Sequence, residues 1–198
     1  MTKKIALLGS TGSIGVQTLA CCKALGYRIN VLAANKSVDL LEQQAREFSP
    51  RCVVVSDKNA YTDIKMRLAD LPVQILAGVD GMCAAAALPE NDVVCNAVVG
   101  MVGLRPTLAA IEAGKTVALA NKETLVAGGQ LVMEAVARTG VGLLPVDSEH
   151  SAIFQSLQGS RRADLSKIIL TASGGPFRGK STAELEHVSL ADALRDPN

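Results

Sequence analysis

The chain lacks several features that mark particular classes of protein. Among its 198 residues there is no Trp, and there are only two Tyr and three Phe, although hydrophobic residues make up 48% of the sequence. A core of this composition must consist of aliphatic side chains, as is typical of parallel sheets that helices cover on both faces. The net charge is +1 and no segment concentrates Lys and Arg, which argues against a nucleic-acid partner.

Targeting signals and membrane spans are also missing from the sequence. Lys3 and Lys4 precede only a short apolar run, and no apolar stretch approaches the roughly 20 residues that cross a bilayer. Five cysteines occur without C-x-x-C or zinc-site spacing, which favours buried free thiols in a reducing compartment. They are Cys21, Cys22, Cys52, Cys83 and Cys95. We therefore expect a cytoplasmic protein without a membrane partner.

What the chain does contain is a repeated alternation of short apolar runs and helical patterns. The expected strands cover residues 5–8, 29–34, 52–55, 73–76, 93–98, 116–120 and 142–146. The expected helices cover residues 14–25, 38–48, 60–71, 81–88, 104–113 and 122–138. This alternation with short connections predicts the α/β class, with a doubly wound, Rossmann-like parallel sheet over residues 1–146.

Residues 147–198 have a different character. They contain a helical pattern at 151–157, an apolar run at 167–170 that predicts a strand, and a glycine loop at 173–176. The loop could hold a phosphate through Ser173 and backbone N–H groups, or be an ordinary turn. Too few residues follow Asp147 for a second core. We expect the beginning of a second α/β catalytic domain that is incomplete.

A glycine-rich stretch lies between the first expected strand and helix. Gly9, Gly12 and Gly15 are spaced G-x-x-G-x-x-G, one residue longer in the first gap than the common dinucleotide fingerprint. Glycines there let the chain turn sharply and let a ligand approach the backbone, while the helix N-terminus attracts a pyrophosphate. The context favours nucleotide binding over an ordinary glycine-rich turn.

The end of the second strand indicates which dinucleotide would bind. Sites that prefer NAD usually carry Asp or Glu about twenty residues after the glycine loop, for the ribose 2′-hydroxyl. Here the segment reads Asn35-Lys36-Ser37 and has no acid. Because a cation accepts a 2′-phosphate, we predict a preference for NADP. Alternatively, Ser37 only caps the next helix and Lys36 is solvated.

Two later strand ends carry further candidates. Gly100 and Gly103 could let a cofactor ring approach the backbone, or form a simple turn. Asn121 suits the N-cap of the following helix and Glu123 suits its first turn, but Lys122 opposes the helix dipole. Lys122 is explained if it faces an anion or a substrate oxygen; the other possibility is a surface lysine that points away.

The last strand end carries two carboxylates. In an extended segment, residues i and i+2 share one face, so Asp147 and Glu149 could direct two oxygen ligands at one point. Such ligands suit Mg²⁺ or Mn²⁺. Equally, Asp147 or Ser148 could cap a helix over residues 151–157, with the acids serving its dipole. Spacing alone does not separate these alternatives.

Four motifs in order link the chain to a known family. They are Gly9-Ser-Thr-Gly-Ser-Ile-Gly15, Ala120-Asn-Lys-Glu123, Pro145-Val-Asp-Ser-Glu-His150 and Ala172-Ser-Gly-Gly-Pro-Phe177. Together they closely resemble the 1-deoxy-D-xylulose-5-phosphate reductoisomerases of the non-mevalonate isoprenoid pathway, across essentially the whole chain. The joint presence of the second and third motifs is far more specific than any glycine loop.

The resemblance implies an enzyme that depends on NADPH and on Mn²⁺ or Mg²⁺. Its phosphosugar substrate, 1-deoxy-D-xylulose 5-phosphate, becomes 2-C-methyl-D-erythritol 4-phosphate by skeletal rearrangement and hydride reduction of an aldehyde. A homodimer is also implied. The cofactor-binding residues implied are Thr11, Gly12, Ser13, Ile14, Asn35, Lys36, Ser37, Asn121 and Glu123. Asp147 and Glu149 would bind the metal. The implied substrate contacts are Lys122, Ser148, Glu149 and Ser173, with Lys122 and Glu149 catalytic.

The chain also departs from the family pattern. That pattern continues with a lid carrying His and Trp, a second phosphate-binding segment, a third metal carboxylate and a helical C-terminal domain, and these residues include none of them. We therefore expect an N-terminal portion that binds NADPH, holds metal poorly and lacks activity alone.

Three other classes compete with this interpretation. A sensing module would bind NADP without catalysis and leave Asp147, Glu149 and Lys122 without a role. A short-chain dehydrogenase would need Tyr-x-x-x-Lys, but Tyr61 and Lys65 fall too early in the chain. A semialdehyde dehydrogenase would need a catalytic Cys after the nucleotide half, and none follows Cys95.

Overall fold

The structure is a computed structural model that describes residues 2–170 and 175–195. The chain divides into two compact units, Met1–Asp147 and Ser148–Asn198. Each unit is described by itself below.

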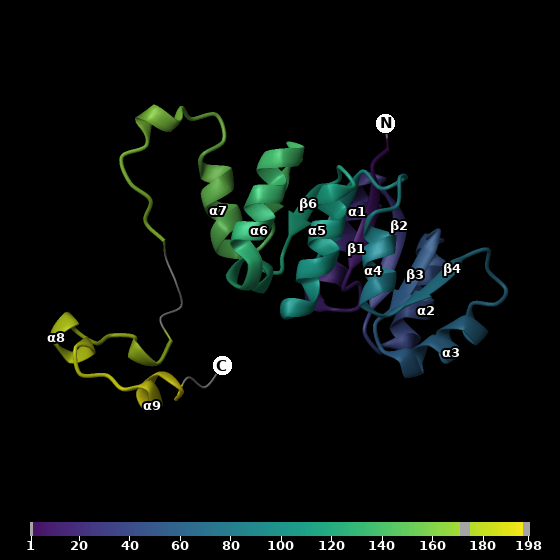
Figure 1. Ribbon diagram of the computed structural model, residues 1–198, viewed down its shortest axis with the longest axis horizontal. Helices are drawn as coiled ribbons and strands as arrows, with labels where there is room; N and C mark the ends of the chain where they lie inside the picture. The colour runs from purple at the N-terminus through teal and green to yellow at the C-terminus, as the bar shows by residue number, and fades with distance from the viewer. Residues whose placement is uncertain (1, 171–174, 196–198) are drawn as a thin grey trace. The chain divides into compact units, whose positions relative to one another are not determined.

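The first unit is built on a seven-stranded sheet in which all neighbouring strands are parallel. The strands are β1 (Lys4–Leu8), β2 (Arg28–Ala34), β3 (Cys52–Val55), β4 (Gln74–Ala77), β5 (Val93–Asn96), β6 (Thr116–Leu119) and β7 (Leu143–Pro145). Their order in the sheet is β4-β3-β2-β1-β5-β6-β7 (Figure 1). The chain therefore moves from the central β1 to one edge of the sheet at β4. It then returns to the centre, where β5 pairs with the other side of β1, and continues to the opposite edge at β7.

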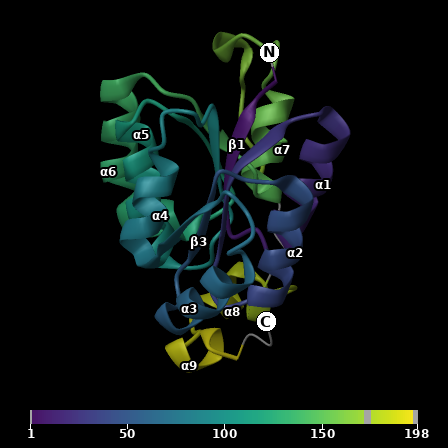
Figure 2. The same cartoon turned by 90° about the vertical axis from the view of Figure 1, so that its right-hand side faces the viewer.

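Helices cover both faces of this sheet, as Figure 2 shows. One face carries α1 (Ser13–Leu25), α2 (Val38–Phe48) and α3 (Lys58–Arg67). The other carries α4 (Gly78–Ala86), α5 (Leu104–Glu112) and α6 (Glu123–Thr139). A short 3₁₀ turn, η1 (Met101–Gly103), precedes α5. The predicted doubly wound α/β fold is confirmed.

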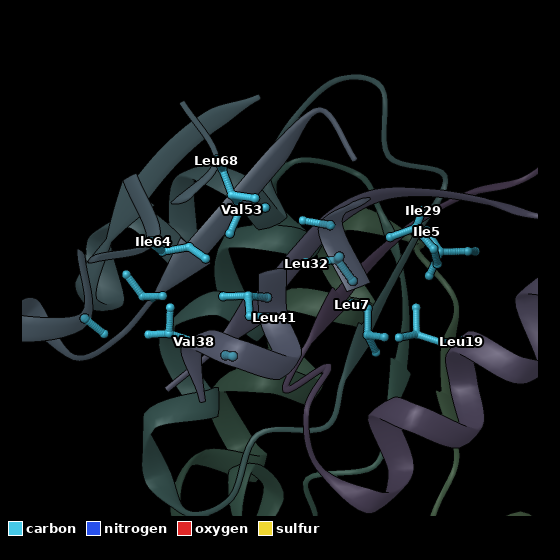
Figure 3. Close-up of a cluster of buried hydrophobic side chains, with 14 of the residues drawn as sticks. Ile5, Leu7, Leu19, Ile29, Leu32, Val38, Leu41, Val53, Ile64 and Leu68 are labelled. Carbon is cyan, nitrogen blue, oxygen red and sulfur yellow. The ribbon is translucent and has the colours of Figure 1, made fainter. Parts of the chain in front are cut away.

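Two aliphatic clusters form the core, one on each face of the sheet. Successive strand residues point to opposite faces, so Leu7 joins the cluster under α1–α3 while Leu8 joins the cluster under α4–α6. Figure 3 shows the first cluster, where Leu32 lies between Leu7 and Leu41. These strands are apolar on both sides because helices bury both.

Two of the predicted elements agree with the structure to the residue. The helix Val38–Phe48 and the strand Cys52–Val55 have the predicted bounds. The described cysteines are free, as predicted, but the prediction that they are buried is wrong for two of them: Cys21 is exposed and Cys83 is intermediate.

Tyr61 and Lys65, which have the Tyr-x-x-x-Lys spacing, both lie on α3, and the Lys65 ammonium group is 5.6 Å from the centroid of the Tyr61 ring.

The second unit contains helices but no strand among its described residues. Its elements are α7 (Ser148–Ser156), η2 (Arg162–Asp164), η3 (Gly175–Phe177), α8 (Thr182–Leu185) and α9 (Leu190–Ala193). The strand predicted at 167–170 is wrong: this segment pairs with no described strand, and Ile168, Ile169 and Leu170 are 54%, 71% and 61% exposed. An apolar run becomes a strand only where another strand satisfies its backbone.

Two further points concern the chain as described. No helix in the described part combines the length and the apolar character needed to cross a membrane. Ser173, a predicted substrate contact, lies outside the described residues.

Candidate functional site

The arrangement of the strands defines where a ligand would bind. β1 lies between β2 and β5, and the chain reverses its direction of travel across the sheet between these two neighbours. Open parallel sheets bind ligands at such a switch point, beyond the carboxyl ends of the strands. A pocket of about 470 Å³ lies there, lined by residues that follow β1, β2, β3 and β5. Its lining includes Gly9, Thr11, Gly12, Asn35, Ser56, Met82, Val98 and Val102.

Two glycines shape the loop after β1 for steric reasons. Gly9 has a φ of +89°, and a Cβ there would lie 2.5 Å from the carbonyl oxygen of Ala97. A Cβ on Gly15 would lie 2.2 Å from the carbonyl oxygen of Gly9. Neither position accepts a side chain without displacing backbone. The loop therefore packs tightly between the end of β5 and the start of α1.

Gly12, between them, differs because the space beside it is open. Apart from its two chain neighbours, the only described atom within 4 Å of a Cβ built there is the carbonyl oxygen of Gly9, at 3.6 Å. Gly12 precedes α1, no side chain caps this helix, and its first turn contains no acid. The helix thus presents N–H groups and the positive end of its dipole at the pocket, which suits a phosphate. Thr11, Ser13 and Ile14 flank this position.

The segment after β2 supplies one wall of the pocket and a cation. Asn35 lines the pocket, and Asn35, Lys36 and Ser37 are exposed. Ser37 occupies the N-cap position of α2, but its side chain makes no capping hydrogen bond. In the described residues no carboxylate pairs with Lys36. The ammonium group and the hydroxyl are therefore available to a ligand.

Asn121 connects the start of α6 to the loop after β5. Its Oδ1 accepts hydrogen bonds from the backbone N–H and the hydroxyl of Thr124, at 2.7 and 2.6 Å. Asn121 thus satisfies a free N–H of the first turn, as a capping residue does, although Lys122 and not Asn121 occupies the N-cap position of α6. Its Nδ2 donates to the carbonyls of Val98 and Gly100. These four bonds use the whole capacity of the side-chain amide. The side chain holds the pocket loop, so a cofactor contact would have to come from another part of the residue.

Asn96 was missed by the sequence analysis and supports the same loop. It is fully buried at the end of β5, and its Nδ2 donates to the carbonyl of Gly103 and to Thr107 Oγ1. A Cβ on Gly103 would lie 2.9 Å from the Nδ2 atoms of both Asn96 and Asn121. The sequence signal that could have identified Asn96 is a single polar residue at the end of an apolar strand.

Lys122 and Glu123 both lie exposed at the beginning of α6. No carboxylate of the described chain pairs with Lys122. Lys122 therefore lies after the carboxyl end of β6 with an uncompensated positive charge, because the N-terminus of α6 beside it is also positive.

The two carboxylates after β7 are arranged differently from the prediction. α7 begins at Ser148, three residues before the predicted start, so Glu149 lies in a helix and the shared-face argument for an extended segment is wrong. Ser148 and Glu149 line a pocket of about 510 Å³ within the second unit, together with Lys167. Over the described residues, no group of three His, Cys, Asp or Glu side chains could hold a metal ion.

Comparisons with known sequences identify close relatives. The sequence profile of 1-deoxy-D-xylulose 5-phosphate reductoisomerase matches residues 5–129, and that of its C-terminal domain matches residues 143–198. The reductoisomerase of Lachnoclostridium phytofermentans is 53% identical over 99% of the chain, and that of Agathobacter rectalis is 51% identical over 99%. The chain covers 51% and 52% of these relatives, so it spans about half the length of the curated proteins it matches.

Solved structures agree with these matches. The Zymomonas mobilis reductoisomerase in complex with NADPH has a TM-score of 0.85 and 43% identity, covering 100% of this chain and 52% of that one. A reductoisomerase in complex with NADPH, fosmidomycin and magnesium has a TM-score of 0.82 and 39% identity, covering 99% and 51%. With both profiles matched in order, the chain belongs to the 1-deoxy-D-xylulose 5-phosphate reductoisomerase family.

Proposed function

We propose that this chain forms the NADPH-binding part, and the beginning of the catalytic part, of a 1-deoxy-D-xylulose 5-phosphate reductoisomerase. Residues 1–146 would form the NADPH domain and residues 147–198 the first part of the catalytic domain. The observation that carries the proposal is the pocket at the switch point, where the uncapped start of α1 meets open space beside Gly12. Relatives solved with NADPH support the choice of cofactor.

The cofactor would be held at two points. Thr11, Gly12, Ser13 and Ile14 would bind its pyrophosphate at the start of α1. Asn35, Lys36 and Ser37 would hold the 2′-phosphate, since Lys36 has no carboxylate partner in the described chain and no acid stands there to repel the phosphate. Asn121 would hold the loop over the cofactor, and Glu123 would contact it. When bound, NADPH supplies the hydride for the reduction step.

The substrate would lie near the ends of β6 and β7. Lys122 would stabilise negative charge that develops on substrate oxygens during rearrangement. Asp147 and Glu149 would provide oxygen ligands for Mg²⁺ or Mn²⁺, which would act as a Lewis acid and template. Ser148, Glu149 and Ser173 would contact the phosphosugar. Because the described residues offer no cluster of three ligands, further ligands must come from substrate, water or other protein segments.

A second candidate function is an NADP-dependent sensing module without catalysis. The absence of a three-ligand cluster from the described residues favours it. It assigns no role to Asp147, Glu149 or Lys122, whereas the enzyme requires all three. We also infer a homodimer in the cytoplasm that binds neither nucleic acid nor membranes, in keeping with the chain's near-neutral charge.

The discriminating experiment measures turnover in a longer protein. The chain is fused to the second half of the Lachnoclostridium phytofermentans relative, and NADPH oxidation is followed with 1-deoxy-D-xylulose 5-phosphate and Mn²⁺. The enzyme hypothesis predicts that Asp147→Asn and Glu149→Gln each lower kcat by at least about 100-fold while the Kd for NADPH is unchanged. A sensor would show no turnover in any version, and that outcome would replace the enzyme hypothesis.

A further inference from the structure

The inner face of α2 contains one polar residue among apolar ones. The buried residues of this helix are Val38, Leu41, Gln44 and Ala45. Gln44 is 5% exposed, whereas its neighbour Gln43 is exposed. A long amide on a buried helix face requires a reason, because an apolar side chain would fill the same space without losing hydrogen bonds to water.

Gln44 reaches from α2 to the glycine loop after β1. Its Nε2 donates to the carbonyl oxygen of Ser10 at 2.9 Å, and Ser10 itself is fully buried. The backbone N–H groups of Gly9 and Ser10 both donate to the carbonyl of Ala33, at 2.8 Å each. The peptide units on both sides of Ser10 are therefore anchored, one to the end of β2 and the other to α2.

The anchored carbonyl fixes a neighbouring donor. Ser10 C=O and Thr11 N–H belong to one planar trans peptide, so they point in opposite directions. Gln44 holds the carbonyl on the α2 side and turns the Thr11 N–H away from it. Thr11 lines the pocket. The backbone N–H groups of Gly9, Ser10 and Gly12 donate to carbonyls, but no acceptor among the described residues receives the N–H of Thr11. A backbone donor is thus oriented and left available beside the open space at Gly12.

Packing alone does not favour a glutamine at this position. Gln44 Oε1 and Ser10 Oγ are both buried without a hydrogen-bond partner in the described structure. Burying such atoms is unfavourable, and a Leu or Met at position 44 would avoid part of that cost. The one bond that Gln44 does make, to Ser10, is the contact that distinguishes it from an apolar side chain.

We infer that Gln44 is a positioning residue for the cofactor pyrophosphate, acting through the Ser10–Thr11 peptide. This inference rests on the proposed function, because it takes the pocket ligand to be a dinucleotide. It assigns Gln44 to the pyrophosphate and not to the 2′-phosphate, which the Asn35–Ser37 segment would hold. Loss of the bond should therefore weaken all dinucleotides equally and leave the preference for NADPH over NADH unchanged.

The test compares Gln44→Met with Gln43→Met in the 198-residue chain. Met has nearly the shape of Gln but cannot donate a hydrogen bond. The Kd values for NADPH and NADH are measured by calorimetry, and the melting temperature by circular dichroism. We expect Gln44→Met to weaken both cofactors by about five- to tenfold with an unchanged ratio between them. Gln43→Met should bind as the wild type does.

Each outcome decides between the two proposals. If the wild type binds NADPH and Gln44→Met binds it equally well, the role of Gln44 is overturned while the proposed function stands. A fall in the NADPH-to-NADH preference would also overturn it, because the effect would then lie in the 2′-phosphate segment. Absence of binding to the wild type would overturn both proposals.

A second variant covers the case in which Gln44→Met does not fold. In Gln44→Glu, a protonated carboxyl can donate to the Ser10 carbonyl, but an ionised one cannot. Because position 44 is buried, we expect the pKa of this carboxyl to lie above its ordinary value of about 4.3, so that protonation increases between about pH 8 and about pH 5.5. Relative to the wild type at each pH, this variant should therefore bind NADP⁺ better at the lower pH. Equal relative affinity at both pH values would contradict the positioning role.

Discussion

The two units of the chain differ in how they use apolar residues. In Met1–Asp147, aliphatic side chains from strands and helices form two buried clusters. From 148 to 195, no described residue is buried, and Leu190 and Leu194 are 76% and 75% exposed. Apolar segments with similar local sequence patterns are thus buried in the first unit and exposed in the second. An apolar run becomes a core strand only when other segments of the sheet bury it.

The largest expected effect tests this difference directly. Leu32→Ala removes a fully buried side chain from the first cluster and should lower the free energy of unfolding by about 3–5 kcal/mol. Ile169→Ala, at a residue 71% exposed, should change it by less than about 0.5 kcal/mol. Urea unfolding followed by circular dichroism measures both. Comparable losses would show that the second unit has a core of its own.

The next prediction separates packing from binding within the first unit. Gly15→Ala places a Cβ 2.2 Å from the Gly9 carbonyl oxygen. It should destabilise the fold by about 2–4 kcal/mol. Gly12→Ala adds a Cβ in ordinary contact with the Gly9 carbonyl oxygen, at 3.6 Å. It should unfold at nearly the wild-type urea concentration, yet bind NADPH more weakly. A variant at Gly12 that binds normally would mean that the ligand does not approach there.

A pH-dependent loss of stability should also belong to the first unit, which holds all five cysteines. Burial raises the pKa of the Cys52 and Cys95 thiols to about 11 from 9.0. Above pH 9 an unfolded chain releases these protons while the folded chain retains them, so stability falls as pH rises from about 9 to about 11. We expect a loss of about 2 kcal/mol for each of the two thiols.

Urea midpoints at about pH 8 and pH 10.5 measure this loss. Replacing Cys95 by Ala should reduce the difference between the two pH values, whereas replacing the exposed Cys21 should not. An equal dependence on pH in both variants would exclude the buried thiol as the cause.

The smallest expected effect concerns cofactor selectivity. Lys36→Ala should weaken NADPH binding by about five- to tenfold and leave NADH binding unchanged, since only NADPH carries the 2′-phosphate. Lys36 is exposed, so the melting temperature should not change. Lys3→Ala, at an exposed lysine before β1 without a carboxylate partner in the described chain, is the matched control. If both cofactors lost affinity equally, Lys36 would act on something other than the 2′-phosphate.

The sequence predicted the first unit well because its patterns are strong and local. The apolar residues of Val38–Phe48 recur at helical spacing, whereas Cys52–Val55 is a short β-branched run that favours a strand. The spacing of Gly9, Gly12 and Gly15 located the loop. The alternation of elements also implied the parallel sheet. These signals need no knowledge of distant contacts.

Other features could not be predicted because they depend on tertiary contacts. Gln44 looks like any polar helix residue until the fold places it against Ser10. The early start of α7 at Ser148 and the absence of a strand at 167–170 depend on what surrounds these segments. Both cysteines whose burial was wrongly predicted, Cys21 and Cys83, lie on helices, where neighbouring positions face solvent and core in turn.

The most direct test of the central claim is calorimetric titration of the 198-residue chain with NADPH and with NADH, each with and without Mn²⁺. The account predicts saturable binding of NADPH that is tighter than that of NADH and unchanged by Mn²⁺. Such a result would place the cofactor site wholly within the residues described here, with Lys36 as its selective contact. Equal or tighter binding of NADH, or no binding of either, would contradict it.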